Sequence, residues 1–240
     1  LLRTASDVLD PLARRVVNAN YRLGNPAALI NLAADQQAAE FARTDALDAL
    51  ANWASAEPID RVTGEYRQLD QERNTVALAA QLQPRWDDIF QGPPAVQALA
   101  LRVASMFGSE RVLSYARDFL ADEKASWQVR VESIRMIAAA QPHDARELLY
   151  TAADDAQVQV RIAALESLRQ IETADALPLL KRALDRGVVS EQQAALAVLA
   201  ELTSPGADAV LAEWLDRLAH GNVPVEIEVD VAEAATQRGE

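Results

Sequence analysis

The sequence predicts an all-α protein, a right-handed α-solenoid built from about six to seven antiparallel helix pairs. The first observation is a repeat: WQVRVESIRMI at Trp127–Ile137 returns 31 residues later as VQVRIAALESL at Val158–Leu168. The second is that apolar residues in these stretches recur every three or four positions, as on one face of a helix. The third is composition, because half of the chain is hydrophobic and only 5% is aromatic. Helices rich in small residues can pack closely, so these features favour stacked helices.

The repeat can be followed along the chain and gives each unit two helices. Arg130 and Arg161 share one repeat position, which Arg43 occupies upstream, whereas the third and sixth units have Gln97 and Gln192 there. First helices are expected to start near Pro26, Glu72, Glu110, Ala145, Asp175 and Ala207. Second helices are expected to start near Pro11, Glu40, Pro93, Trp127, Gln157, Glu191 and Pro224.

The helix beginning near Gln157 shows why such a hairpin needs neighbours. Its predicted buried face is Val160, Ala164, Leu168 and Ile171. One hairpin cannot cover this face, but a stack of hairpins can. Arg161 lies at the edge of the face, and Asp154 or Asp155 in the preceding turn is placed either to hold its guanidinium group or to cap the helix.

One insertion interrupts an otherwise single repeat domain, which we expect to span residues 1–240. The irregular segment at about residues 55–70 contains Pro58, Gly64 and many polar residues. Long loops often carry function. The segment is therefore either a docking loop using Asp60, Arg61, Tyr66 and Arg67 or a surface loop held by a turn at Asp60 and Arg61.

The C-terminal stretch is ambiguous, because apolar and acidic residues alternate strictly from Val225 to Val231, as in a strand. The repeat nevertheless places a second helix here. We expect residues 225–236 to form a helix that closes the array. Its wide apolar arc, which includes Ile227 and Val231, is expected to leave a seam for a following domain or another copy of the chain.

Charge and composition exclude several classes of function. The formal net charge is −13 and the pI about 4.6, which argues against binding nucleic acid or an anionic membrane. There is no cysteine, so disulfides and thiolate metal sites are excluded. No apolar run reaches the length of a membrane span. Because the sequence opens at Leu1 rather than Met, we expect a part of a larger multidomain protein.

Two resemblances follow from these motifs. The pattern V-R-x-x-A-x-x-x-L, recurring near 31 residues, resembles HEAT repeats, and most closely the short bacterial kind named for phycobilisome lyases. VNANYRLGNPAAL, ALANWASAEPIDRVTGEYRQL and LAHGNVPVEIEVDVAEA resemble the helical region of large planctomycete-type secreted proteins. Those proteins join a sugar-dehydrogenase-like propeller, a HEAT array and a c-type cytochrome with a C-x-x-C-H motif. This second resemblance implies a periplasmic or secreted bacterial protein.

No catalytic, metal or cofactor site can be recognised in the sequence. His143 and His220 are far apart and have no partner at metal-ligand spacing. We therefore expect no enzyme and no cofactor, but a scaffold that contacts a protein or neighbouring domains of the same polypeptide. The expected partner surface is Asp45, Asp48, Asp60, Arg61, Tyr66, Glu132, Arg135, Glu166, Gln170, Glu201, Ile227 and Val231.

Two enzymatic functions are the alternatives to this scaffold. The resemblance to phycobilin lyases implies a HEAT-like enzyme that acts on a tetrapyrrole, which would need a deep pocket with acids and aromatic residues. Some HEAT-like folds are DNA glycosylases, which need a basic surface. The dispersed aromatic residues disfavour the first alternative, and the net charge of −13 disfavours the second.

Overall fold

The computed structural model consists of helix pairs and connecting turns. It describes residues 2–56, 58–69, 73–107, 110–170 and 176–239, with side chains from Pro11 onward. Within these ranges no strand occurs, and the only β-type pairing is an isolated bridge between Ile59 and Tyr66. The chain divides into two compact units, residues 1–136 and 137–240.

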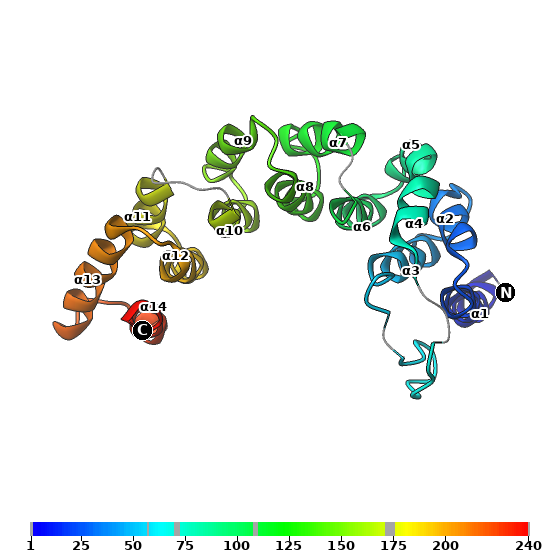
Figure 1. Ribbon diagram of the computed structural model, residues 1–240, viewed down its shortest axis with the longest axis horizontal. Coiled ribbons are helices and arrows are strands. Elements are labelled where there is room, and N and C mark those ends of the chain that lie inside the picture. Colours follow the sequence, from blue (N-terminus) through cyan, green and yellow to red (C-terminus); the bar gives the residue numbers. More distant parts are fainter. Residues whose placement is uncertain (1, 57, 70–72, 108–109, 171–175, 240) are drawn as a thin grey trace. The chain divides into compact units, whose positions relative to one another are not determined.

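The first unit has two layers of helices. Its helices are α1 (Leu2–Arg22), α2 (Pro26–Ala34), α3 (Glu40–Ala51), α4 (Thr75–Leu82), α5 (Trp86–Phe90), α6 (Pro94–Ser105), α7 (Glu110–Ala121) and most of α8 (Trp127–Ala140). A 3₁₀ turn, η1 (Gln83–Arg85), joins α4 to α5. Helices α1, α3, α6 and α8 form one row, and α2, α5 and α7 lie in the other (Figure 1).

The second unit repeats this arrangement. Its helices are α9 (Ala145–Ala152), α10 (Val158–Ser167), α11 (Leu177–Arg186), α12 (Val189–Glu201), α13 (Pro205–Ala219) and α14 (Glu228–Gly239). Two 3₁₀ turns are η2 (Leu168–Gln170), which follows α10, and η4 (Val225–Ile227), which precedes α14. Helices α9, α11 and α13 form the row of first helices, and α10, α12 and α14 form the row of second helices (Figure 1).

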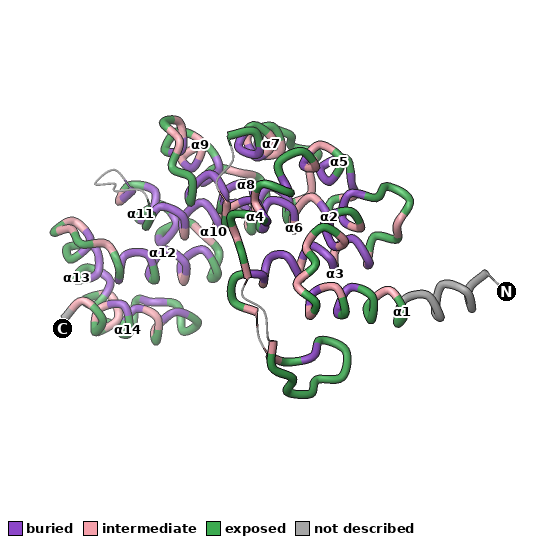
Figure 2. The backbone as a smooth tube through the Cα atoms, turned by 45° about the vertical axis from the view of Figure 1, so that its right-hand side comes forward, coloured by how far each residue is buried: buried purple, intermediate pink, exposed green. Residues whose placement is uncertain are grey.

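The repeat spacing places equivalent side chains in the interior. Ala164, Ala195 and Ile227 occupy one repeat position, and all three are fully buried. Leu168, Leu199 and Val231 occupy the next inward position and are also fully buried. Burying such apolar side chains supplies most of the stability of stacked hairpins. Figure 2 shows these buried stretches alternating with exposed ones along the helices.

The Arg or Gln at the repeat position closes the C-terminal end of the first helix of its own pair. Arg43 donates from Nε to the Ala33 carbonyl at 2.9 Å, and the Arg130 guanidinium donates to the Leu120 carbonyl at 3.3 Å. The glutamines do the same: Gln97 donates to the Phe90 carbonyl at 3.0 Å, and Gln192 to the Leu184 carbonyl at 2.8 Å. The last carbonyls of a helix have no partner within the helix, so this position needs a long donor rather than a charge. Replacement of Arg by Gln therefore preserves the repeat.

Arg161 departs from the expected pairing. It donates to the backbone carbonyl of Asp155 at 2.8 Å, but its carboxylate partner is Glu191 of the next repeat. The two Arg161–Glu191 bonds are 2.6 and 3.0 Å long. The Asp154 carboxylate instead pairs with Arg182 at 2.7 Å. The sequence therefore did not predict Glu191 as the hydrogen-bonded carboxylate of Arg161, while Asp155 and Asp154 of the preceding turn add a smaller electrostatic effect that raises the pKa of Arg161.

Most helix boundaries agree with the sequence, and the all-α paired-helix architecture is confirmed. The expected starts at Glu72 and Asp175, and the buried position Ile171, lie outside the described residues. The expected start at Pro11 is wrong, because α1 begins at Leu2 and contains Pro11. Proline removes one backbone hydrogen-bond donor from a helix, and its ring crowds the preceding turn. The Leu, Arg and Ala residues before Pro11 favour helix, so α1 continues through it.

The C-terminal prediction of a helix is confirmed. Residues 225–227 form the 3₁₀ turn η4, and α14 continues from Glu228. The alternating pattern that suggests a strand is overridden because Ile227 and Val231, four residues apart, both enter the interior.

Candidate partner-binding surface

Asp60 organises the inserted loop of the first unit. Its carboxylate accepts hydrogen bonds from the backbone N–H groups of Val62 and Thr63 at 2.9 and 3.0 Å, and from the Asn18 side-chain amide at 3.0 Å. The backbone N–H groups of Thr63 and Val62, and then the Asn18 amide, hold the pKa of Asp60 well below its usual range. Arg22 lies 3.8 Å away and adds a smaller effect in the same direction. The loop is thus held by one ionised, buried carboxylate.

Arg61 and Arg22 fasten the loop to the helices. Arg61 donates to the carboxylates of Asp45 and Asp48 on α3, at 3.2 and 2.5 Å. Burial raises the pKa of Asp45, and Arg61 opposes that rise. Arg22, at the end of α1, donates to the backbone carbonyl of Arg67 at 2.8 Å. The structure therefore brings Asp45, Asp48 and Arg61 together, and their ion pairs attach the inserted loop to α3.

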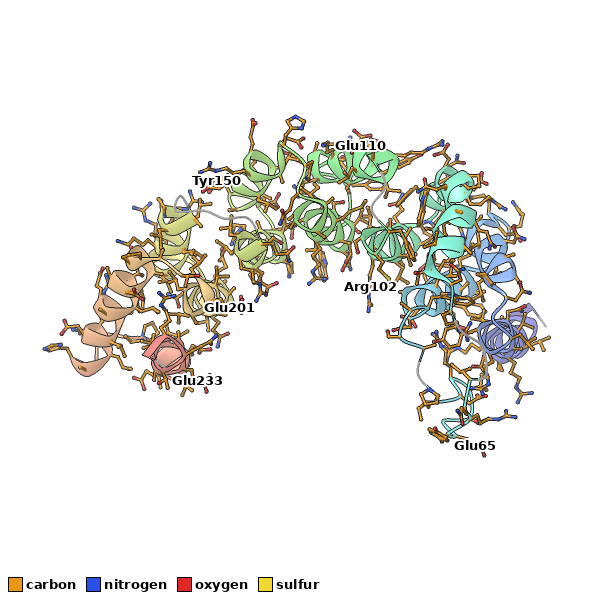
Figure 3. The ribbon with its side chains drawn as sticks, in the orientation of Figure 1. Glu65, Arg102, Glu110, Tyr150, Glu201 and Glu233 are labelled. Atoms are coloured by element: carbon orange, nitrogen blue, oxygen red, sulfur yellow. The ribbon has the colours of Figure 1, made fainter. Side chains whose placement is uncertain are left out.

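The far end of the loop is open to solvent. Tyr66 is 71% exposed, and Ile59 and Val62 are 42% and 40% exposed. Figure 2 shows most of this segment as exposed, and Figure 3 shows Glu65 at its end. Asp60 is only 3% exposed, so its prediction as a contact residue is wrong. The Asp60 carboxylate is occupied by hydrogen bonds from the backbone of its own loop, whereas the Tyr66 side chain is exposed and free to contact a partner.

The second helices of the first unit expose a mixed set of charges. Arg135 on α8 pairs with Glu132 at 2.6 Å, and about half of the Arg135 side chain is exposed. Arg102 on α6 occupies the repeat position equivalent to Arg135, is exposed, and points away from the row of first helices (Figure 3). Sequence reasoning missed Arg102, although the step between the two arginines is 33 residues, close to the repeat length.

The second helices of the second unit expose an acidic set. Glu201 on α12 lies 31 residues after Gln170, and both are exposed. The Arg169 guanidinium pairs with the Glu201 carboxylate at 2.9 Å. Glu166, on α10 of the same row of second helices, is partly exposed. We define the acidic face as Glu166, Gln170 and Glu201.

Ile227 and Val231 do not belong to any accessible surface. Both are fully buried, so their prediction as contact residues is wrong. The wide apolar arc is covered on the side that carries these two residues, because α14 packs against α12 and α13. Its uncovered side carries Val225 and Val229, which are 73% and 66% exposed.

No metal or membrane feature emerges from the described part of the chain. Within it, no group of three or more His, Asp or Glu side chains is arranged to hold a metal ion. His143 and His220 are both exposed, and His220 Nδ1 lies 2.7 Å from the backbone carbonyl of Asp216. No helix among the described residues is long and apolar enough to cross a membrane.

A comparison with known protein families finds a match for part of the chain. Residues 120–200 match the family model described as HEAT repeats. The matched segment runs from the end of α7 to the end of α12, where the 31-residue repeat is clearest. No curated protein matches the chain. The match and the paired helices together support a HEAT-like repeat protein, a class whose members generally mediate protein interactions.

Proposed function

We propose that this HEAT-like repeat chain is a non-catalytic interaction scaffold. Its second helices bind a partner protein or neighbouring domains of the same polypeptide. The observation that carries the proposal is that some repeat positions are always buried while others are always exposed. One set, such as Leu168 and Leu199, is buried and builds the stack, while another, such as Gln170 and Glu201, faces solvent from the same helices.

A repeat architecture makes such solvent-facing residues useful for binding. Side chains that recur at the repeat length stand on rigid helices, so they form a row with defined spacing. A partner can contact several of them without reorganising the chain.

The charge of this surface indicates the chemistry of the partner. The chain carries a net charge of −13, and the acidic face contributes Glu166 and also Glu201, whose charge is partly offset by its pairing with Arg169. Complementary charge speeds encounter and selects the orientation of a partner. We propose a basic partner, for which a c-type cytochrome is the example that the resemblance to propeller and cytochrome proteins implies.

The test measures binding of a purified basic c-type cytochrome by calorimetry at low and physiological salt. The variant is Glu166→Gln with Glu201→Gln, and the matched control is Glu123→Gln with Glu147→Gln, two exposed acids outside the row of second helices. Because exposed ion pairs contribute roughly 0.2–1 kcal/mol each, the variant should weaken binding about threefold to tenfold. Equal binding by the variant and the control would contradict the proposal.

A further inference from the structure

The last helix pair, α13 and α14, forms an open groove on the surface of the second unit. Leu218 on α13 and Val229 and Ala232 on α14 contribute its apolar surface, and Glu228 and Glu233 also line it. Its volume is about 690 Å³. We call this feature the α13–α14 groove. Val229 is 66% exposed and Ala232 is exposed, so the apolar part faces solvent.

The charged residues that line the groove are both acidic. Among the described residues, Glu228 and Glu233 take part in no ion pair. The arginines of the same two helices are committed elsewhere. Arg217 binds Asp185 and Glu213, and Arg238 binds Asp208. The groove therefore presents apolar surface with uncompensated negative charge beside it.

The repeat positions show that this surface is not built for another hairpin of the same kind. Glu228 occupies the position that Leu165 and Leu196 hold in the two preceding repeats, with Ala164, Ala195 and Ile227 as the buried neighbours one residue before each. Leu165 and Leu196 are 3% and 1% exposed. A hairpin that covered α14 as the repeats cover one another would bury the carboxylate of Glu228, which is unfavourable without a cation.

A second copy of the chain is also a poor occupant. It would bring another molecule with a net charge of −13 against Glu228 and Glu233. Like charges at an interface oppose association. The complementary occupant has apolar side chains for Val229 and Leu218 and cations for the two glutamates.

We propose that the α13–α14 groove binds an amphipathic helix of a partner protein, with leucine-type side chains on one face and lysine or arginine along its edges. This inference rests on the proposed scaffold function and specifies one of its binding sites. A helix suits the groove because Glu228 and Ala232 lie four residues apart on a helical ridge, against which a second helix can pack. Apolar anchors at every third or fourth residue would enter between α13 and α14.

The experiment uses a fluorescent 18-residue synthetic peptide with leucines at helical spacing and flanking lysines, and measures its binding to the full chain by anisotropy. The variant Glu228→Lys with Glu233→Lys should lose at least about tenfold in affinity. The control Glu123→Lys with Glu147→Lys makes the same change in net charge at two exposed acids outside the groove. It should bind the peptide as the unmodified chain does, apart from a small general effect of net charge.

Two further measurements separate a specific groove from general charge attraction. A peptide with glutamates in place of the lysines should bind the charge-reversed variant better than the unmodified chain. Val229→Ser should weaken the lysine peptide several-fold without any change of charge. The groove proposal is overturned if the charge-reversed variant binds as tightly as the control, or if Val229→Ser has no effect.

The failure of this inference can be told apart from the failure of the scaffold proposal. Loss of cytochrome binding in the Glu166 and Glu201 variant, without any peptide binding, would refute the groove alone. Peptide binding at the groove, with cytochrome binding indifferent to Glu166 and Glu201, would refute the proposed acidic face and support the groove.

Discussion

The ion pair between Arg161 and Glu191 should couple two successive repeats, and its removal offers a sharp test of how they hold together. Arg161 on α10 makes two hydrogen bonds to the Glu191 carboxylate on α12, and it also donates to the carbonyl of Asp155. Glu191 is only 5% exposed. Its carboxylate also accepts the backbone N–H of Val188 at 3.0 Å, so it ties the start of α12 to the same network.

The magnitude follows from what Arg161→Ala leaves behind. The hydrogen bond from Arg161 is the main reason that the pKa of Glu191 is lowered, so without Arg161 a largely buried carboxylate keeps only one strong donor. Breaking a fully buried pair costs about 3–5 kcal/mol. Because about a fifth of the Arg161 side chain is exposed, water compensates for part of that loss. We expect a cost of about 2–3 kcal/mol.

Native-state hydrogen exchange resolves where this cost falls. Amides of α10 and α12 should exchange roughly 30- to 150-fold faster in Arg161→Ala, since about 1.4 kcal/mol corresponds to a factor of ten. Amides of α2 and α3, in the first unit, should be unchanged. A double-mutant cycle with Glu191→Ala isolates the pair. A coupling energy below about 0.5 kcal/mol, or a loss of protection spread evenly over all helices, would refute the reasoning.

Three further predictions concern the buried Leu168, the loop held by Asp60 and the binding of metals or cofactors. Leu168→Ala should reduce the free energy of unfolding by about 2–5 kcal/mol, measured by urea denaturation, because Leu168 is fully buried; a change under about 0.5 kcal/mol would mean that the repeat positions are misassigned. Asp60→Ala should speed tryptic cleavage of the inserted loop several-fold. Because the pKa of Asp60 is lowered on folding, the unmodified loop should stay docked at pH 7 and 5 and loosen only below about pH 4, as the carboxylate is protonated; loop amides whose protection factors, corrected for the intrinsic pH dependence of exchange, do not fall below about pH 4 would contradict this. The purified chain should bind no metal, tetrapyrrole or other cofactor and should hydrolyse nothing; stoichiometric metal in elemental analysis, lost on replacing His143 or His220, would overturn the first of these expectations.

Much of the fold could be predicted because the interior obeys a simple repeat. The small Ala164 and the larger Leu168 recur as Ala195 and Leu199, and helical spacing dictates that they share a face. The partner of Arg161 could not be predicted in the same way. The hydrogen-bonded carboxylate belongs to Glu191, 30 residues away, whereas the sequence pointed to Asp154 or Asp155 in the preceding turn.

The predictions of individual surface residues were less successful for physical reasons. Ile227 and Val231 belong to a helix that is apolar over most of its circumference, so the pattern alone could not say which side α12 and α13 would cover. Asp60 lies in a polar loop, and its carboxylate accepts the backbone N–H groups of Val62 and Thr63 as in the turn that the sequence offered as the alternative to a docking loop. The Arg102 position was available from the repeat spacing.

The most direct test of the central claim is a hydrogen-exchange footprint of the bound partner. The chain would be saturated with the basic c-type cytochrome, and protection would be compared helix by helix with that of the free chain. The account predicts new protection on the second helices α10 and α12, around Glu166 and Glu201, and none on the first helices α9 and α11. Protection confined to α9 and α11, or no protection at saturating cytochrome, would contradict the claim that the second helices form the binding surface.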